Sequence, residues 1–160
     1  MDTVLGNFDF LKGKKNFESF TNACLEAEKS ILISPATTAI LSRRALELAV
    51  KWLYTFDSDL VLPYQDNISS LIHSNSFIEL IDYKMLPQIK YIIQLGNVAV
   101  HTNKSVKRGE AILSLNNLHK FVSWIDYCYS DEFTAEDFDE DLLDVGEEVR
   151  TRPEELKDLY

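Results

Sequence analysis

Apolar residues recur at alternating steps of three and four along most of this chain, and that spacing constrains the fold more than any other feature. It is clearest over residues 16–33, where five apolar residues share one helix face: Phe17, Phe20, Cys24, Ala27 and Ile31. No segment shows sustained alternation of apolar and polar residues, and only five glycines are available for hairpins. The predicted fold class is therefore all-α, a bundle of four or five helices.

The second predicted helix is the centre of this bundle. Ser34 and Pro35 supply an N-cap and a first-turn proline for it. Between Ala45 and Tyr54 it is apolar on nearly every side, interrupted only by Glu47 and Lys51, which is typical of a helix surrounded by others. The remaining expected elements are a connection over 57–67, short helices over 67–73 and 76–81, a longer helix over 83–101, a polar loop over 102–108 and a last core helix over 111–129.

Charge divides the chain into a helical domain, residues 1–130, and an acidic arm, residues 131–160. The arm holds 13 Asp and Glu against 3 Lys and Arg, so it carries a net charge of −10, the value for the whole chain. We expect either a solvated tail or an extended arm that docks its aromatic residues on a neighbour. Arg152 and Pro153 are typical of a helix start, so we also expect the chain to continue past Tyr160 into further domains.

The neutral domain lacks the general basic surface that nucleic-acid backbones require. Two small clusters are either ordinary loop charge or local contacts to nucleic acid or a partner: Lys12, Lys14 and Lys15, and Lys104, Lys107 and Arg108. The spacing of Cys24 and Cys128 indicates neither a zinc site nor a disulfide framework, so we expect reduced, half-buried thiols. With no leader-like or membrane-spanning segment, we expect a cytoplasmic protein that does not contact membranes.

Common catalytic motifs are absent, including phosphate-binding loops and paired metal ligands, and we expect no metal and no cofactor in this domain. What stands out is polar residues in apolar surroundings. Arg43 and Glu47 lie one helical turn apart, as do Asn97 and His101. We interpret the four as a structural polar cluster across a helix interface. The alternatives are simple surface placement, or a catalytic or ligand site.

Two strings carry a family resemblance: residues 43–54, which begin Arg-Arg-Ala-Leu-Glu, and residues 96–101, Gly-Asn-Val-Ala-Val-His. Together they resemble the helical domain of unknown function that often precedes the nuclease and helicase regions of type I restriction R subunits. Residues 7–11, Ala27-Glu28 and Trp124 fit the same pattern, so the resemblance spans residues 5–145.

That domain is similar to the HEPN superfamily of helical bundles, so the resemblance implies a HEPN-like bundle here. Some HEPN proteins are metal-independent ribonucleases, in which His acts in acid–base catalysis and a preceding Arg stabilises the phosphate charge. His101 and Asn97 fit that motif, but Gly96 stands where the active enzymes carry Arg. Only Arg43, from the neighbouring helix, is left as a candidate cation, and it would have to point at His101.

We therefore expect a noncatalytic accessory or docking domain at the start of a type I restriction R subunit. The resemblance implies that the parent chain translocates and cleaves DNA with ATP and Mg in its downstream motor and nuclease domains, together with methyltransferase and specificity subunits. The first alternative is a HEPN-type ribonuclease or toxin that acts through His101, with Arg43, either as a single chain or as a homodimer. The second is a free-standing adaptor whose acidic tail occupies the nucleic-acid groove of a partner.

Overall fold

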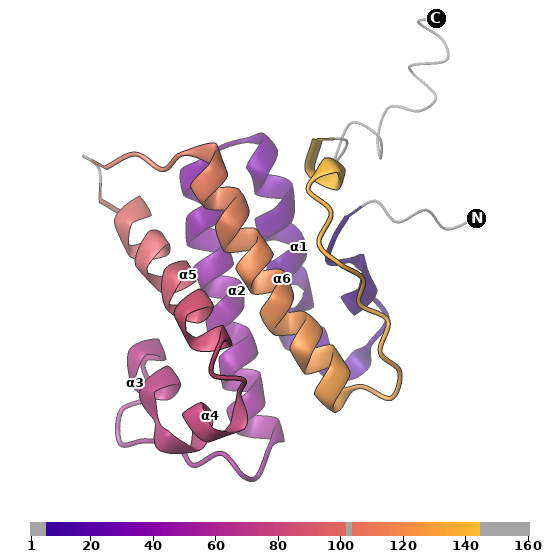
Figure 1. Cartoon of the computed structure of the whole chain (residues 1–160), viewed down its shortest axis with the longest axis vertical. Helices are drawn as coiled ribbons and strands as arrows, with labels where there is room; N and C mark the ends of the chain where they lie inside the picture. The colour runs from indigo at the N-terminus through magenta and orange to yellow at the C-terminus, as the bar shows by residue number, and fades with distance from the viewer. Residues whose placement is uncertain (1–5, 102–103, 145–160) are drawn as a thin grey trace, which may run out of the picture.

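The computed structural model describes residues 6–101 and 104–144, and over this part of the chain the protein is all-α, without a strand. Four long helices lie side by side, and two short ones close the end where α2 leads into α5 (Figure 1). The long helices are α1 (Glu18–Lys29), α2 (Pro35–Phe56), α5 (Met85–Ala99) and α6 (Arg108–Tyr129). The short ones are α3 (Ile68–His73) and α4 (Asn75–Leu80). The expected all-α fold is confirmed.

The first predicted helix is present, flanked by tighter 3₁₀ turns. The turns η2 (Lys15–Phe17) and η3 (Ser30–Leu32) extend α1 at its two ends, so the helical stretch matches the predicted range 16–33. Its apolar face is buried, including Phe20, which has no exposed surface. A further turn, η1 (Asp9–Leu11), lies ahead of it and adds Leu11 to the core.

Helix α2 occupies the centre of the bundle, as its pattern predicts. It packs against α1, α5 and α6, which explains why apolar residues surround it on nearly every side. Its start is fixed by the predicted cap, because the Ser34 hydroxyl accepts a hydrogen bond from the Thr37 backbone N–H at 3.3 Å. Pro35 follows as the first helical residue, where its missing N–H costs nothing.

The connection after α2 is tied down by two tyrosines. The Tyr54 hydroxyl donates to the Leu71 carbonyl at 2.6 Å, which holds α3 against α2. The Tyr129 hydroxyl, at the end of α6, donates to the Asp57 carboxylate at 2.5 Å. Burial and this neighbouring carboxylate raise the pKa of Tyr129, so the phenol stays protonated and remains the donor. The long helix α5 then begins with Pro87 in its first turn, as expected.

The acidic arm, in its described part, does not leave the bundle. Residues 131–144 turn back and run along α6 and the N-terminal segment (Figure 1). Leu143 is buried in the core, and the partly buried Phe138 packs against the core from outside. Neither expected arrangement, a solvated tail or docking on a neighbour, describes residues 131–144, because the arm packs on its own domain. The expected helix beginning near Arg152 lies outside the described residues.

The two cysteines differ from the expectation of half-buried thiols. Both are free, but Cys24 is completely buried in α1 whereas Cys128 is exposed near the end of α6. Cys24 faces the core because it lies on the apolar stripe of α1, and Cys128 lies on the solvent side of α6. Within the described residues, no helix is both long enough and apolar enough to cross a membrane.

Candidate functional site

The predicted site lies where α2 and α5 come into close contact, at Gly96. A Cβ atom at this position would lie 2.8 Å from both the Cβ and the Cδ of Arg43, and 3.2 Å from the Ala39 carbonyl oxygen. Such distances are too short for carbon atoms in contact, so a side chain here would push the helices apart. Gly96 therefore lets the stem of Arg43 lie across α5.

Arg43 forms its ion pair within its own helix. Its Nε lies 3.6 Å from a carboxylate oxygen of Glu47, one turn further along α2, and both side chains are about 30% exposed. This Nε is buried and makes no hydrogen bond within the described part of the chain. An ion pair with this much solvent contact adds little stability, typically under about 1 kcal/mol.

Asn97 and His101 lie on the surface. Asn97 is exposed on α5, directly after Gly96, and His101 is exposed in the turn that follows the helix. That turn is held by backbone hydrogen bonds, from the His101 N–H to the Val98 carbonyl at 3.1 Å and from the Lys104 N–H to the His101 carbonyl at 3.2 Å. The structure therefore brings Arg43, Glu47 and Gly96 together and leaves both Asn97 and His101 facing solvent.

The direction of Arg43 matters for any chemistry at His101. Helices α2 and α5 run antiparallel (Figure 1), so the end of α5 lies beside the beginning of α2. Glu47 lies about 6 Å from the level of Arg43 toward the far end of α2, and His101 lies beyond the end of α5, in the opposite direction from the level of Gly96. The ion-pair partner of Arg43, Glu47, therefore lies on the side of Arg43 away from the His101 end of α5.

A second polar site, missed by the sequence reasoning, joins the N-terminal segment, α1 and the arm. The backbone N–H and the side-chain amide of Asn7 both donate to the same carboxylate oxygen of Glu28 at 2.8 Å. The same Asn7 amide also binds the arm, donating to the Asp139 carbonyl at 3.0 Å and accepting from the Asp139 N–H at 2.7 Å. Burial raises the pKa of Glu28, and the hydrogen bonds from Asn7 offset part of that effect.

Asp126 anchors the beginning of the arm. This carboxylate on α6 is fully buried and forms an ion pair with Lys14 from the N-terminal segment. Its other oxygen accepts the backbone N–H groups of Thr134 and Ala135 at 2.9 and 3.0 Å. Burial alone would raise the pKa of Asp126, but the hydrogen bonds, led by that from Lys14, outweigh it and hold this pKa below its usual value.

His119 lies between these two anchors. It is almost completely buried on α6, with the rings of Phe8, Phe10 and Phe138 packed edge-on around it at centroid distances of 5.5 to 5.6 Å. Burial lowers the pKa of His119 to about 4, although a hydrogen bond with the Asn7 backbone and the nearby charge of Asp137 act in the opposite direction. At neutral pH this imidazole is uncharged and serves as a packing element.

One signal in the sequence identifies these missed residues. Glu28 follows Ala27 on the apolar face of α1, and Asp126 follows Ile125 on the apolar face of α6. A carboxylate on a buried stripe needs partners, because an unpaired buried charge is very costly. The first predicted basic cluster supplies one partner, since Lys14 binds the buried Asp126. In the second, Arg108 forms a solvent-exposed ion pair with Asp144 of the arm at 2.8 Å.

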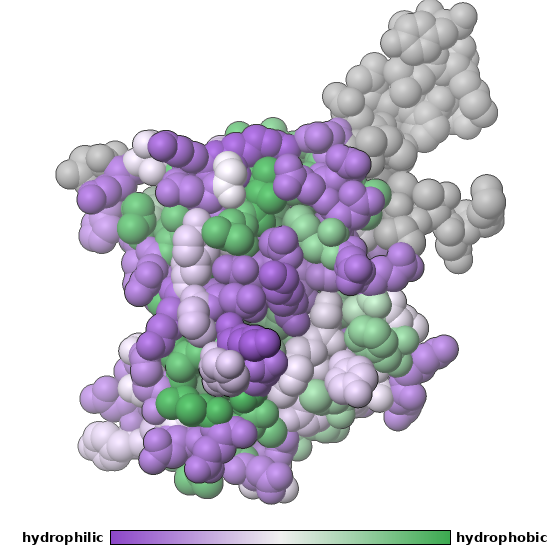
Figure 2. All heavy atoms as spheres, in the orientation of Figure 1, coloured by the Kyte–Doolittle hydropathy of each residue, from purple (hydrophilic) through white to green (hydrophobic). Residues whose placement is uncertain are grey.

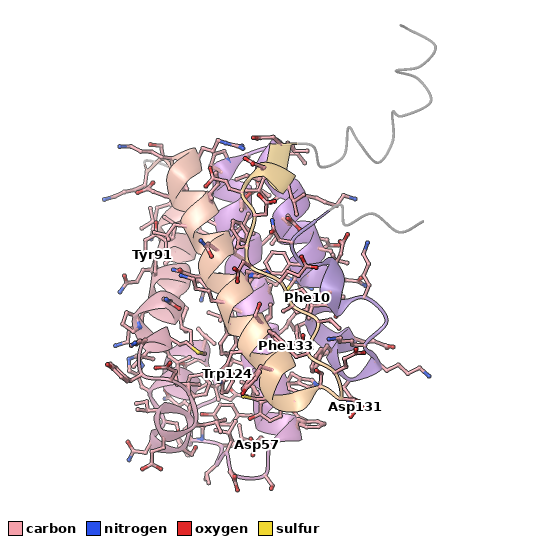
Figure 3. The ribbon with its side chains drawn as sticks, turned by 45° about the vertical axis from the view of Figure 1, so that its right-hand side comes forward. Phe10, Asp57, Tyr91, Trp124, Asp131 and Phe133 are labelled. Atoms are coloured by element: carbon pink, nitrogen blue, oxygen red, sulfur yellow. The ribbon has the colours of Figure 1, made fainter. Side chains whose placement is uncertain are left out.

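A groove of about 390 Å³ opens between α6 and the arm. Six of the residues that line it are Asn116, Lys120 and Ser123 from α6, and Phe133, Glu136 and Asp137 from the arm. Figure 3 shows the arm running beside α6, with Phe133 on it and Phe10 labelled nearby. Within the described residues, no group of three or more His, Cys, Asp or Glu side chains is placed to hold a metal ion.

Comparison with known proteins identifies the family. Residues 25–157 match the family described as "Domain of unknown function (DUF4145)", and this match covers most of the chain, which therefore belongs to that family. No curated protein matches the chain. No solved structure matches it.

Proposed function

We propose that this member of the DUF4145 family is a noncatalytic, HEPN-like docking domain of a type I restriction R subunit. The observation that carries the proposal is the arrangement at Gly96. The Arg43 stem crosses α5 there, but its Nε faces Glu47, on the side away from His101. Because Arg43 is paired with Glu47, it is not a free cation for a phosphate beside His101, where charge would have to be stabilised during transfer at the phosphorus centre.

The anchored arm supports a docking role. Residues 131–144 are fixed to the domain at two points, Asp126 and Asn7, so the described part of the arm is held at a defined place on the bundle. A chain held in this way can position whatever follows it. In the proposed parent chain, the regions after this domain are the nuclease and the motor, which use ATP and Mg to act on DNA. Its partners are the methyltransferase and specificity subunits.

Assembly is the direct test. The complete protein is mixed with the methyltransferase and specificity subunits of the same system, and the complex is measured by size-exclusion chromatography with light scattering. We expect one co-eluting complex, and the loss of DNA-dependent ATP hydrolysis when these subunits are omitted. Separate elution of folded components contradicts the docking proposal.

The second candidate function is a ribonuclease acting through His101, and the exposure of that side chain favours it. Purified protein is incubated with single-stranded and hairpin RNA, and His101→Ala is compared with His73→Ala. His73 is a matched control, since it is also exposed near a helix end. Cleavage that disappears in His101→Ala and persists in His73→Ala establishes the ribonuclease; our proposal predicts no cleavage by any of the three proteins.

A further inference from the structure

The groove between α6 and the arm has acidic side chains that no cation neutralises within the described part of the chain. Glu136 and Asp137 are both exposed and form no ion pair there, whereas Asp144, further along the arm, pairs with Arg108. The cation that lines the groove, Lys120, is exposed on α6 and forms no ion pair with a described residue. His119, at the base of the groove, is uncharged at neutral pH, so the groove carries a net negative charge.

The acidic side chains of the groove are held in place by the arm's anchors. Thr134 and Ala135 are bound by Asp126 on one side, and Asp139 is bound by Asn7 on the other. Glu136 and Asp137 lie between these points, and Phe138 next to them packs against His119. A short segment fixed at both ends loses little entropy when it binds a ligand, so this site is preorganised.

An aromatic wall completes the groove. Phe133 lines it and is 53% exposed, and its ring lies edge-on to that of the more exposed Tyr127 at a centroid distance of 5.6 Å. Figure 2 shows hydrophilic side chains over the middle of this face, with hydrophobic ones in separate small patches. Recognition through this face therefore depends on charge and on single aromatic contacts more than on a broad apolar surface.

We propose that this groove binds an arginine side chain of a basic segment in a partner protein. A guanidinium is planar, stacks on an aromatic ring and donates several hydrogen bonds to carboxylates, which matches a phenylalanine wall beside two carboxylates. The amide of Asn116 and the hydroxyl of Ser123 offer further acceptors in the same groove. The inference rests on the proposed docking role, since it names the chemistry of the partner.

The test uses a labelled peptide, Gly-Arg-Gly-Arg-Gly-Arg, and the same peptide with citrulline or lysine in place of arginine. Binding to the full chain is measured by fluorescence anisotropy. The double variant Glu136→Gln with Asp137→Asn removes the groove's charge. Its matched control, Glu140→Gln with Asp141→Asn, removes the same charge from the same arm outside the groove. Circular dichroism and thermal melting confirm that each variant folds.

We expect the arginine peptide to bind, and the groove variant to weaken it about tenfold, the loss of one favourable contact of roughly 1.4 kcal/mol. The control pair should change the affinity by less than about twofold, because salt screens the interaction of charges outside the groove with the bound peptide. Phe133→Ser should also weaken binding, whereas Lys120→Gln should strengthen it, because the Lys120 ammonium in the groove repels a guanidinium. Citrulline should abolish binding and lysine should weaken it.

Three results would overturn the inference. The first is an equal loss of peptide affinity in the groove variant and its charge-matched control, and the second is equal affinity for the arginine peptide and for either the citrulline or the lysine peptide. The third is tighter binding of agmatine, a small free guanidinium compound, than of the arginine peptide. The two proposals fail in different ways. If the subunits assemble but the peptide does not bind, the groove inference fails and the docking role stands. If the peptide binds through the groove but no subunit assembles, the docking role fails and the groove inference stands.

Discussion

Two contacts between distant parts of the chain, that of α2 with α5 and that of the arm with the bundle, are stabilised by different interactions. At the α2–α5 contact, a glycine lets two helices meet, and the polar residues around it are partly or fully exposed. At the contact between α6, the N-terminal segment and the arm, buried carboxylates and an amide are fully engaged with partners from all three segments. The first contact depends on close packing, and the second on a polar network that becomes costly when one member is removed.

The largest effect should come from Asp126→Ala, in the arm contact. It leaves two arm N–H groups without their acceptor and leaves the Lys14 ammonium with the Glu132 carbonyl but no carboxylate, and removal of one partner from a buried pair is strongly destabilising. We expect a loss of about 3 kcal/mol in the free energy of unfolding, because Lys14 can still reach water. Urea denaturation measures it. Asp131→Ala, an exposed acid on the same arm, should change stability by less than about 0.5 kcal/mol, and equal effects would contradict the network.

The next largest effect is a dependence of the unfolding free energy on pH, caused by His119. Its pKa of about 4 in the folded protein lies below the usual 6.5, so the unfolded chain binds the proton more readily. The stabilisation is present above pH 6.5 and is lost as the pH falls toward 4. From pH 7 to pH 5 we expect a loss of about 2 kcal/mol in the unfolding free energy.

His119→Phe isolates this contribution, because it removes the titrating group but keeps an aromatic ring among the three phenylalanines. Glu28 acts in the opposite sense, since its pKa is raised, and it is present in both proteins. The difference in slope between wild type and variant therefore reports His119 alone. Parallel pH profiles for the two proteins would show that His119 is not buried as described.

A smaller effect is expected for Gly96→Ala, at the α2–α5 contact. The new Cβ would lie 2.8 Å from the Arg43 stem, and such overpacking costs about 1 to 3 kcal/mol, against about 1 kcal/mol gained from the helix propensity of alanine. The expected net loss is about 1 kcal/mol in thermal or urea unfolding. Gly109→Ala is the matched control on α6, where nothing lies within 4 Å, so it should be neutral or stabilising. An equal change in stability for Gly96→Ala and Gly109→Ala would refute the close contact between Gly96 and the Arg43 stem.

The smallest effect should come from Glu47→Gln, which removes the ion pair with Arg43 but keeps the shape of the side chain. Both partners are about 30% exposed, so we expect a loss below about 0.5 kcal/mol, and less in 0.5 M NaCl. Double-mutant cycles with Arg43→Met measure the coupling. A coupling above about 1.5 kcal/mol would show that this pair is more than a surface ion pair, as the predicted structural polar cluster of Arg43, Glu47, Asn97 and His101 requires.

Local sequence signals predicted the helices well. The spacing in α1, the Ser34 cap and the apolar surround of α2 are confirmed, because each depends on neighbours within a few turns. The arm was not predictable in this way. Asn7 and Asp139 are 132 residues apart, and only the three-dimensional fold brings an amide near that backbone.

The candidate site was predicted in part. Helical spacing correctly puts Arg43 beside Glu47, since the two are one turn apart on the same helix. Whether Asn97 and His101 turn toward α2 depends on how the two helices are rotated about their axes, which the spacing within one helix does not determine. The role of the four residues as a structural cluster stays a prediction, and the Glu47 experiment addresses it.

A comparison of Asn7→Ala with Asn97→Ala tests the central claim most directly, because the chemical change is the same in the two regions. Asn7 binds Glu28 and both backbone groups of Asp139, so its loss should lower the unfolding free energy by about 2 kcal/mol and make the arm sensitive to proteolysis. Asn97 is exposed in a helix, where alanine has the higher propensity, so its replacement should be neutral or slightly stabilising. Equal effects, or a larger loss from Asn97→Ala, would contradict the account.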